Sequence, residues 1–182
     1  MKSITYITGN MGKYENAKVF LGKYDIEVRQ QKLSLDEIQG DDAVAITVRK
    51  ARDAYAQLGR PLFVNDASWI IPSLNGFPGP YMRNMVEWFT MDDILTLMAH
   101  KTDRTVILRD TIVYIDDQGE HVFTHDTVGS ILAEPAGEPR GPFITQIFSL
   151  RKDGKSISED STVGFSEEEA VLWDEFGTWL SS

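Results

Sequence analysis

The chain has 182 residues, 42% of them hydrophobic, which is enough for one ordinary domain with a sizeable core or for two closely packed lobes. Its formal net charge of -10 argues against a nucleic-acid-binding surface, because such surfaces carry clustered lysine and arginine. It contains no cysteine and no run of the ~18 apolar residues that a membrane span needs, so we expect a cytoplasmic protein without disulfides, thiolate metal sites or membrane contacts.

The first half of the chain alternates between strand and helix patterns. Strands are predicted at residues 3–7, 25–30 and 62–66. Helices are predicted at residues 13–22, 43–58 and 91–100. Asp42 is a suitable N-cap for the second of these helices, and Gly59 and Pro61 end it. Thr90 and Asp93 have the spacing of a capping box at the start of the third.

The second half has a different pattern. Two long β-type runs, residues 104–116 and 121–133, surround the turn sequence DQGE and predict a hairpin. A terminal helix is predicted at residues 166–180. Strands that alternate with helices first, followed by a long hairpin, predict an α/β domain with a mixed sheet.

The sequence TGNMGK, residues 8–13, follows the first predicted strand and leads into the first predicted helix. A helix N-terminus exposes unpaired N–H groups, and Thr8, Asn10 and Lys13 add a hydroxyl, an amide and an ammonium to that positive end. Phosphate suits this arrangement, although the Walker pattern GxxxxGK[ST] is absent. A plain turn with a helix cap explains the same residues equally well.

Candidate metal ligands come from the carboxylates, since Mg²⁺ typically binds through one or two carboxylates together with substrate phosphates. Glu37 lies in a polar loop, and Asp66 ends a strand that looks buried, where an ion is costly without a partner. A solvated loop residue and a turn-forming aspartate are the alternatives for these two positions. Lys50 lies in the second predicted helix, where most lysines are solvated surface residues.

Three segments together resemble the inosine triphosphate pyrophosphatase family, whose members hydrolyse non-canonical purine nucleoside triphosphates to monophosphate and pyrophosphate. The segments are TGNMGK, LDEIQG before a helix that contains KA, and VNDASWIIPSLNGFPGPYMR with its L-x-G-x-PG-x-Y pattern. Their order and spacing match over residues 3 to about 90. Each segment is short, so it is their ordered combination that makes the resemblance specific.

The resemblance implies an elongated, two-lobed α/β fold with a long mixed central sheet flanked by helices and an active-site cleft between the lobes. Residues 1–182 would form a single domain of this kind, with the second lobe at roughly residues 100–150. The resemblance also implies a small-molecule nucleotide as the substrate, Mg²⁺ as the cofactor with Mn²⁺ as a substitute, and a homodimer.

The resemblance also implies roles for particular residues. Those expected to bind the substrate are Thr8, Asn10, Lys13, Ser68 and Arg83. Glu37 and Asp66 would bind Mg²⁺, and Asp66 would also orient or deprotonate the attacking water. Lys50 would be the second catalytic residue, because it would neutralise charge on the phosphates. Cations around a phosphate tail and a carboxylate beside water are the groups that such a transfer requires.

The second half departs from the family pattern. The base-recognising loop of the family usually reads F-G-[YW]-D-P-x-F, whereas this chain has PFITQIF, with Thr145 about where the aspartate is expected. The Ser-His-Arg triplet near the end of the family is absent, and the chain after Lys155 has seven acids and no lysine, arginine or histidine. A buried group that reads a 6-keto oxygen contributes orders of magnitude to discrimination, so we expect base choice to be relaxed or redirected.

We therefore expect a Mg²⁺-dependent nucleoside triphosphate pyrophosphatase with altered base specificity. A catalytically weak or inactive nucleotide-binding or interaction module on the same fold is the alternative. A third possibility retains hydrolysis but changes the substrate, to a phosphorylated metabolite or a modified pyrimidine nucleotide.

Overall fold

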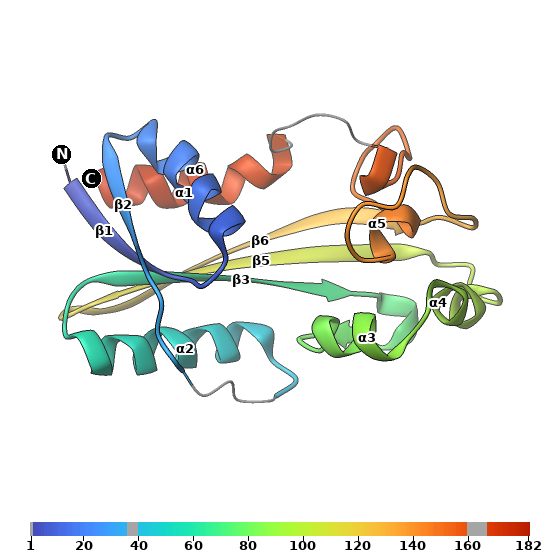
Figure 1. Cartoon of the computed structure of the whole chain (residues 1–182), viewed down its shortest axis with the longest axis horizontal. Coiled ribbons are helices and arrows are strands. Elements are labelled where there is room, and N and C mark those ends of the chain that lie inside the picture. The colour runs from blue at the N-terminus through green and yellow to red at the C-terminus, as the bar shows by residue number, and fades with distance from the viewer. Residues whose placement is uncertain (1, 36–39, 160–166) are drawn as a thin grey trace. The chain divides into compact units, whose positions relative to one another are not determined.

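The computed structural model of the chain describes residues 2–35, 40–159 and 167–182 (Figure 1). Its strands are β1 (Lys2–Ile7), β2 (Ile26–Gln31), β3 (Leu62–Ile70), β4 (Pro78–Gly79), β5 (Thr105–Asp116), β6 (Gly119–Ile131) and β7 (Phe148–Ser149). Its α-helices are α1 (Met11–Gly22), α2 (Ala43–Leu58), α3 (Met82–Trp88), α4 (Met91–Met98), α5 (Ile144–Ile147) and α6 (Glu167–Ser181). Among these described residues, no helix combines the length and the apolar character that crossing a membrane requires.

Two of the predicted helices are confirmed at their caps. α2 has its predicted bounds, because the Asp42 carboxylate accepts two backbone N–H groups of the first turn and Gly59 ends the helix with a φ of 59°. Thr90 and Asp93 form the predicted capping box of α4. That helix ends at Met98, two residues earlier than predicted.

Other elements differ from the prediction. α3 and α5 were not expected, since helices of seven and four residues are too short to display a 3.6-residue period. β3 continues to Ile70, whereas the sequence predicted its end at Asp66. The polar pair Asn65 and Asp66 therefore lies inside a strand, a position at which each side chain needs a partner.

The described strands form one mixed sheet. Its order is β2-β1-β3-β5-β6-β7, with β4 paired to β3. β1 is parallel to β2 and β3, whereas the pairs β3–β4 and β6–β7 are antiparallel. Only residues 117–118 separate β5 from β6, its neighbour in the sheet, which confirms the predicted hairpin. The α/β class and the long mixed sheet flanked by helices are likewise confirmed.

The chain divides into two compact units. Unit 1 contains the described residues up to Asp66, residues 110–125 and α6, and unit 2 contains residues 67–109 and the described residues from Asp126 to Glu159. β3, β5 and β6 each contribute residues to both units. The second lobe expected at roughly residues 100–150 overlaps unit 2 only in part and stays a prediction.

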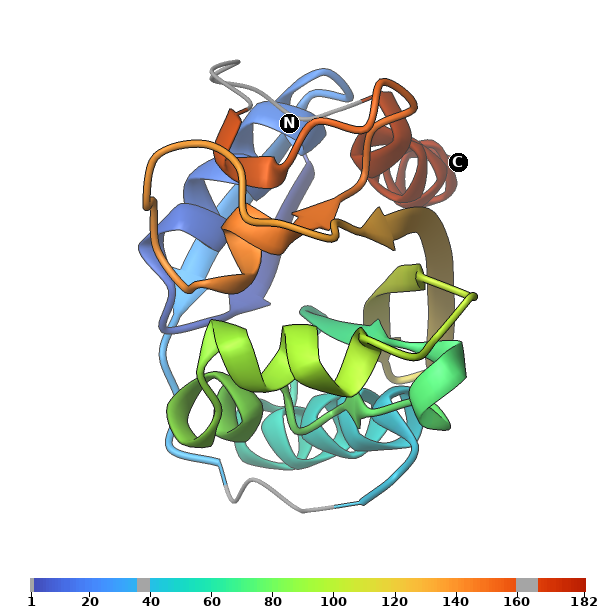
Figure 2. The ribbon, with the colours of Figure 1, turned by 90° about the vertical axis from the view of Figure 1, so that its right-hand side faces the viewer.

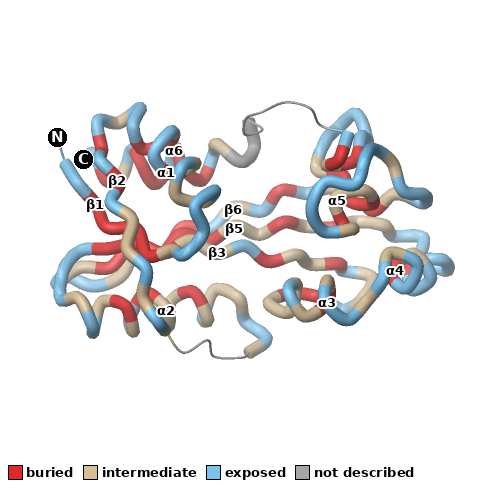
Figure 3. The backbone as a smooth tube through the Cα atoms, in the orientation of Figure 1, coloured by how far each residue is buried: buried red, intermediate tan, exposed pale blue. Residues whose placement is uncertain are grey.

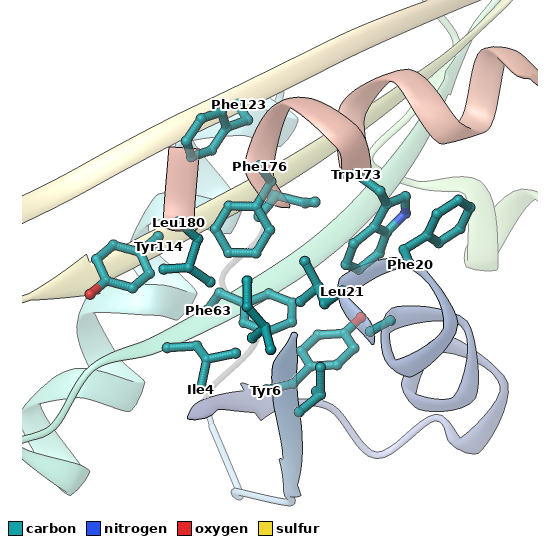
Figure 4. Close-up of a cluster of buried hydrophobic side chains, with 14 of the residues drawn as sticks. Ile4, Tyr6, Phe20, Leu21, Phe63, Tyr114, Phe123, Trp173, Phe176 and Leu180 are labelled. Atoms are coloured by element: carbon teal, nitrogen blue, oxygen red, sulfur yellow. The ribbon is translucent and has the colours of Figure 1, made fainter. Parts of the chain in front are cut away.

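In unit 1, helices cover both faces of the strands. α1 and α6 lie on one face and α2 lies on the other (Figure 1). Tyr6 of β1 and Phe63 of β3 stack with their ring centroids 4.3 Å apart, and Trp173 and Phe176 of α6 pack against Phe63 (Figure 4). On the opposite face, the buried Ala51 of α2 belongs to a second apolar cluster. These two cores fix α1 and α2 to β1 and β3.

In unit 2, hydrogen bonds join the proline- and glycine-rich loop to the segments that follow it. The hydroxyl oxygen of Thr145 in α5 lies 2.9 Å from three oxygen atoms, the carbonyls of Arg140 and Pro142 and the hydroxyl of Ser158. The side-chain amide of Gln146 donates to the carbonyl of Gly137. These segments, drawn in orange, therefore lie side by side (Figure 2).

We expect Gly177→Ala to lower the free energy of unfolding by about 1–3 kcal/mol, the usual cost of overpacking. A Cβ atom at Gly177 would lie 2.5 Å from Cδ2 of the Tyr24 ring. Urea denaturation followed by circular dichroism measures the change. The control is Gly22→Ala at the end of α1, where a Cβ would have no neighbour within 4 Å and alanine is the better helix former. Equal stability of the two variants would contradict the prediction.

Candidate active site

The turn after β1 is held by its own side chains. β1 is exposed at its first two residues and buried over its last four, so the chain leaves the core at Thr8 (Figure 3). The backbone N–H of Asn10 donates to Oγ1 of Thr8 at 3.1 Å, and Oδ1 of Asn10 accepts the backbone N–H of Lys13 at 3.2 Å. The helix cap is thus confirmed, with Asn10 as the N-cap of α1. Phosphate binding by Thr8 and Asn10 stays a prediction.

The N-terminus of α1 keeps its full positive character. The first turn of this helix contains no acidic residue that would offset the helix dipole. Gly9, Asn10, Met11 and Gly12 are exposed, so the residues of this turn are open to solvent. An anion could approach this turn without displacing a side chain carboxylate.

Lys13 extends from the first turn of α1 to β3. Its Nζ atom lies 3.2 Å from the backbone oxygen of Asn65 and 3.5 Å from Oδ1 of Asp66. The Lys13 side chain is 32% exposed. It therefore connects the helix terminus to the Asp66 carboxylate while it remains accessible to a ligand.

Lys50 reaches the same carboxylate from α2. Its Nζ atom lies 3.5 Å from Oδ2 of Asp66, so each carboxylate oxygen faces a different ammonium group. Strong charge-assisted bonds between these groups are ~2.7–2.9 Å long, and both contacts here are longer. The side chains of Lys50 and Asp66 are 33% and 43% exposed. Both ammonium groups are consequently close enough to offset the negative charge of Asp66, and their long contacts leave them able to turn toward a second anion.

These contacts connect all five predicted site residues in the described part of unit 1: Thr8, Asn10, Lys13, Lys50 and Asp66. Two ammonium groups and one carboxylate give these side chains a formal charge of +1. The Lys50 side chain is partly exposed and its ammonium lies near Asp66, and its catalytic role stays a prediction. A triphosphate, with its several negative charges, suits this cluster better than a cation or a neutral ligand does.

Two polar residues beside this cluster were not singled out in the sequence. Tyr6 is completely buried, and burial is the main reason that the pKa of its hydroxyl is raised. The negative charges of Asp66 and Asp110 raise this pKa further, whereas the nearby Thr8 side chain lowers it. Asp110 lies in β5, the neighbour of β3 in the sheet. An acid inside the long β-type run LRDTIV is the sequence signal that could have indicated it.

The side chains of this cluster offer few oxygen donors for the Mg²⁺ ion that the resemblance implies. Asp66 offers a partly exposed carboxylate, and one or two carboxylates with phosphate oxygens and water are the usual Mg²⁺ environment. Glu37, the other expected ligand, lies outside the described residues. Within the described ranges, no three histidine, aspartate or glutamate side chains form a metal-binding group. The residues present therefore fit a Mg²⁺ ion that shares its coordination with substrate phosphates, rather than one held by protein alone.

The remaining expected substrate-binding residues belong to unit 2. Ser68 of β3 is buried, and its hydroxyl has no hydrogen-bond partner among the described residues. Arg83 is an exposed residue in the first turn of α3. Substrate binding by both residues stays a prediction.

Known proteins resemble this chain over most of its length. A dITP/XTP pyrophosphatase of Methanopyrus kandleri is 36% identical over 136 residues, which cover 74% of this chain and 72% of the relative. An inosine triphosphate pyrophosphatase of Candida glabrata is 32% identical over 146 residues, which cover 76% and 73% of the two chains.

Solved structures show the same fold. The Ham1 protein of Staphylococcus aureus superposes with a TM-score of 0.81 at 20% sequence identity over 98% of each chain. A HAM1 protein from Coxiella burnetii gives a TM-score of 0.80 at 20% identity over 100% of this chain and 99% of that one. The sequence model of the Ham1 family matches residues 4–162. The chain thus belongs to the Ham1 family.

Proposed function

We propose that this protein is a Mg²⁺-dependent pyrophosphatase of nucleoside triphosphates, which releases a nucleoside monophosphate and pyrophosphate. The observation that carries the proposal is the Asp66 carboxylate between the ammonium groups of Lys13 and Lys50, next to the N-terminus of α1. The relatives named dITP/XTP and inosine triphosphate pyrophosphatase support purine nucleotides, non-canonical ones included, as the substrate class.

In the proposed mechanism, the phosphates of the substrate bind at the N-terminus of α1 and attract the ammonium groups of Lys13 and Lys50. Asp66 then loses its two cationic partners and becomes a stronger base. It orients a water molecule and accepts its proton as the water oxygen bonds to the α-phosphorus and the bond to the bridging oxygen breaks. Bound Mg²⁺ supplies further charge neutralisation on the phosphate oxygens. Pyrophosphate is the leaving group.

We propose in addition that a side chain at position 145 does not select the base. The Thr145 hydroxyl has one proton, yet it already faces the carbonyl oxygens of Arg140 and Pro142 and the hydroxyl of Ser158. These contacts support an internal role for Thr145 in unit 2. The homodimer and the cytoplasmic location expected from the sequence stay predictions.

We expect Asp66→Asn to reduce pyrophosphate release from ITP or XTP by at least about a thousandfold, because the amide cannot accept the proton of the attacking water. Asp53→Asn is the control, since Asp53 pairs with Arg49 within α2 and should retain full activity. Pyrophosphate and orthophosphate are assayed separately. Orthophosphate as the first product would contradict cleavage between the α- and β-phosphates.

Calorimetry with the same variants separates the enzyme from a non-enzymatic module. If the protein is an enzyme, the wild type should hydrolyse ITP and the Asp66→Asn variant should bind ITP tightly without hydrolysing it. If the protein is a non-enzymatic module, the wild type itself should bind ITP without hydrolysing it, and that result would refute the proposed hydrolysis.

We expect Lys50→Gln to lower kcat/KM by roughly 10–100-fold, because a hydrogen bond to a charged group contributes about 1.5–3 kcal/mol. Arg49→Gln is a matched control, since Arg49 precedes Lys50 in the same helix and its guanidinium pairs with Asp53 instead. Steady-state kinetics with ITP measure both variants. Equal losses in the two variants would mean that Lys50 acts only through the general charge of α2.

We expect kcat/KM for ITP and ATP to differ by less than about tenfold. Sites that read a base by hydrogen bonds to buried groups reject the wrong partner by about 10⁴-fold, and Thr145 does not supply such a group under our proposal. Competition between the two triphosphates in one reaction gives the ratio directly. A preference above about a thousandfold for either base would show that another residue reads it.

A further inference from the structure

The end of β2 fixes the turn between β1 and α1. β1 and β2 are parallel, and the last pairs of their register are Tyr6 with Gln30 and Ile7 with Gln31. Thr8, the next residue, continues this contact, because its backbone N–H donates to the backbone oxygen of Gln31 at 3.1 Å. Its own backbone oxygen accepts a hydrogen bond from the side-chain amide of Gln30, also at 3.1 Å. Both main-chain groups of Thr8 are therefore bound to β2.

The Gln30 side chain lies on the face of β2 that α1 covers. Ile26 and Val28 of β2 belong to the apolar cluster that also contains Phe20 of α1. Since side chains two residues apart share a face of a strand, Gln30 follows them on that face. The hydroxyl of Tyr14 in α1 donates to the backbone oxygen of Val28 at 3.4 Å, which ties the helix itself to β2. Gln30 is thus a polar residue at the end of an apolar row, at the point where β2 meets the turn.

The hydrogen bond from Gln30 sets the direction of the peptide group between Thr8 and Gly9. In a trans peptide, the carbonyl oxygen and the following N–H point in opposite directions. Because the Thr8 oxygen is turned to Gln30, the Gly9 N–H points away from β2. Glycine has no side chain that would oppose a reversal of this peptide, and a Cβ atom at Gly9 would meet nothing within 4 Å. The hydrogen bond is therefore what selects one of the two directions.

The direction of this peptide matters to an anion. Gly9 is exposed and directly precedes Asn10, the N-cap of α1. Backbone N–H groups of successive turn residues form concave sites that attract anions, and the N-terminus of a helix adds positive character. A reversed peptide would instead present the Thr8 carbonyl oxygen, which carries partial negative charge, at the same place. All of these residues belong to unit 1.

We propose that Gln30 is a positioning residue for the phosphates of the substrate: its amide holds the Thr8 carbonyl at β2, so that the Gly9 N–H donates a hydrogen bond to a phosphate oxygen. The inference rests on the proposed function, in which phosphates bind at the N-terminus of α1. Gln30 itself does not touch the substrate and acts through the peptide between Thr8 and Gly9. A donor that is already oriented needs no rearrangement when the anion arrives.

The first test is binding of inorganic pyrophosphate, the proposed leaving group, to the whole chain. We expect pyrophosphate to move the amide-proton resonance of Gly9 downfield in nuclear magnetic resonance spectra of the wild type, because this N–H gains a charged acceptor. We expect Gln30→Leu to weaken pyrophosphate binding about 3–10-fold in calorimetry, and to reduce the movement of the Gly9 resonance.

Gln118→Leu is the matched control. It makes the same substitution at an exposed residue of the turn between β5 and β6, and it should bind pyrophosphate within twofold of the wild type. Circular dichroism establishes that each variant is folded. The Gly9 resonance of the wild type needs no variant, so the proposal can be refuted even if Gln30→Leu does not fold.

Kinetics with ITP distinguish a positioning role from a purely structural one. We expect Gln30→Leu to raise KM about 3–10-fold with kcat within twofold of the wild type, because the lost contact contributes to phosphate binding in the ground state and the transition state alike. A purely structural glutamine would lower the folded fraction, which reduces the apparent kcat and leaves KM unchanged.

The inference is overturned if saturating pyrophosphate leaves the wild-type Gly9 resonance in place, or if folded Gln30→Leu binds pyrophosphate within twofold of the wild type. Hydrolysis of ITP by the wild type tests the proposed function separately. Weaker pyrophosphate binding in Gln30→Leu without any wild-type hydrolysis would support the positioning role and refute the proposed activity. Full wild-type hydrolysis with unchanged pyrophosphate binding in Gln30→Leu would do the reverse.

Discussion

Asp66 lies inside β3 with its side chain 43% exposed, and two cations lie within reach of its carboxylate. Two helices supply them: Lys13 from the first turn of α1 and Lys50 from α2. Each helix is fixed to the strands by its own apolar cluster, on opposite faces of the sheet. The carboxylate thereby depends on both cores of unit 1, and a shift of either helix would leave one of its oxygens without an ammonium group.

Features of the fold that depend on local chemistry could be predicted from sequence. The bounds of α2 follow from Asp42 and Gly59. An aspartate side chain accepts the N–H groups at a helix start, and a glycine readily adopts the positive φ at a helix end. The end of β3 could not be predicted, because Asn65 and Asp66 are polar residues that usually mark a turn. Their partners, Thr111 and the two lysines, come from distant parts of the chain, so tertiary contacts outweighed the local preference.

In the candidate site, too, the local features could be predicted from sequence and the contacts between distant segments could not. The turn at Thr8 and Asn10 could be recognised as a helix cap because its hydrogen bonds span only two or three residues. That Lys50 and Asp66 belong to one site could be expected only through family resemblance, since a helical lysine alone indicates a surface position. Asp110 carries no motif at all. The place of its neighbour Thr111 beside Asn65 follows from the order of the strands in the sheet, which a single sequence does not specify.

Electrostatics explain why such a local arrangement is needed. The chain has a formal net charge of -10, so its long-range field does not attract a polyanion such as a triphosphate. At physiological ionic strength, however, charges separated by more than about 8 Å are largely screened, and a ligand at α1 responds mainly to its nearest neighbours. Those neighbours are the open helix terminus and two ammonium groups held in place by Asp66. In the proposed mechanism the ligand draws the ammonium groups away from Asp66, which is then left beside further negative charge. The proposed divalent cation would offset that charge, so under this proposal one carboxylate accounts both for the position of the two lysines and for the use of a metal.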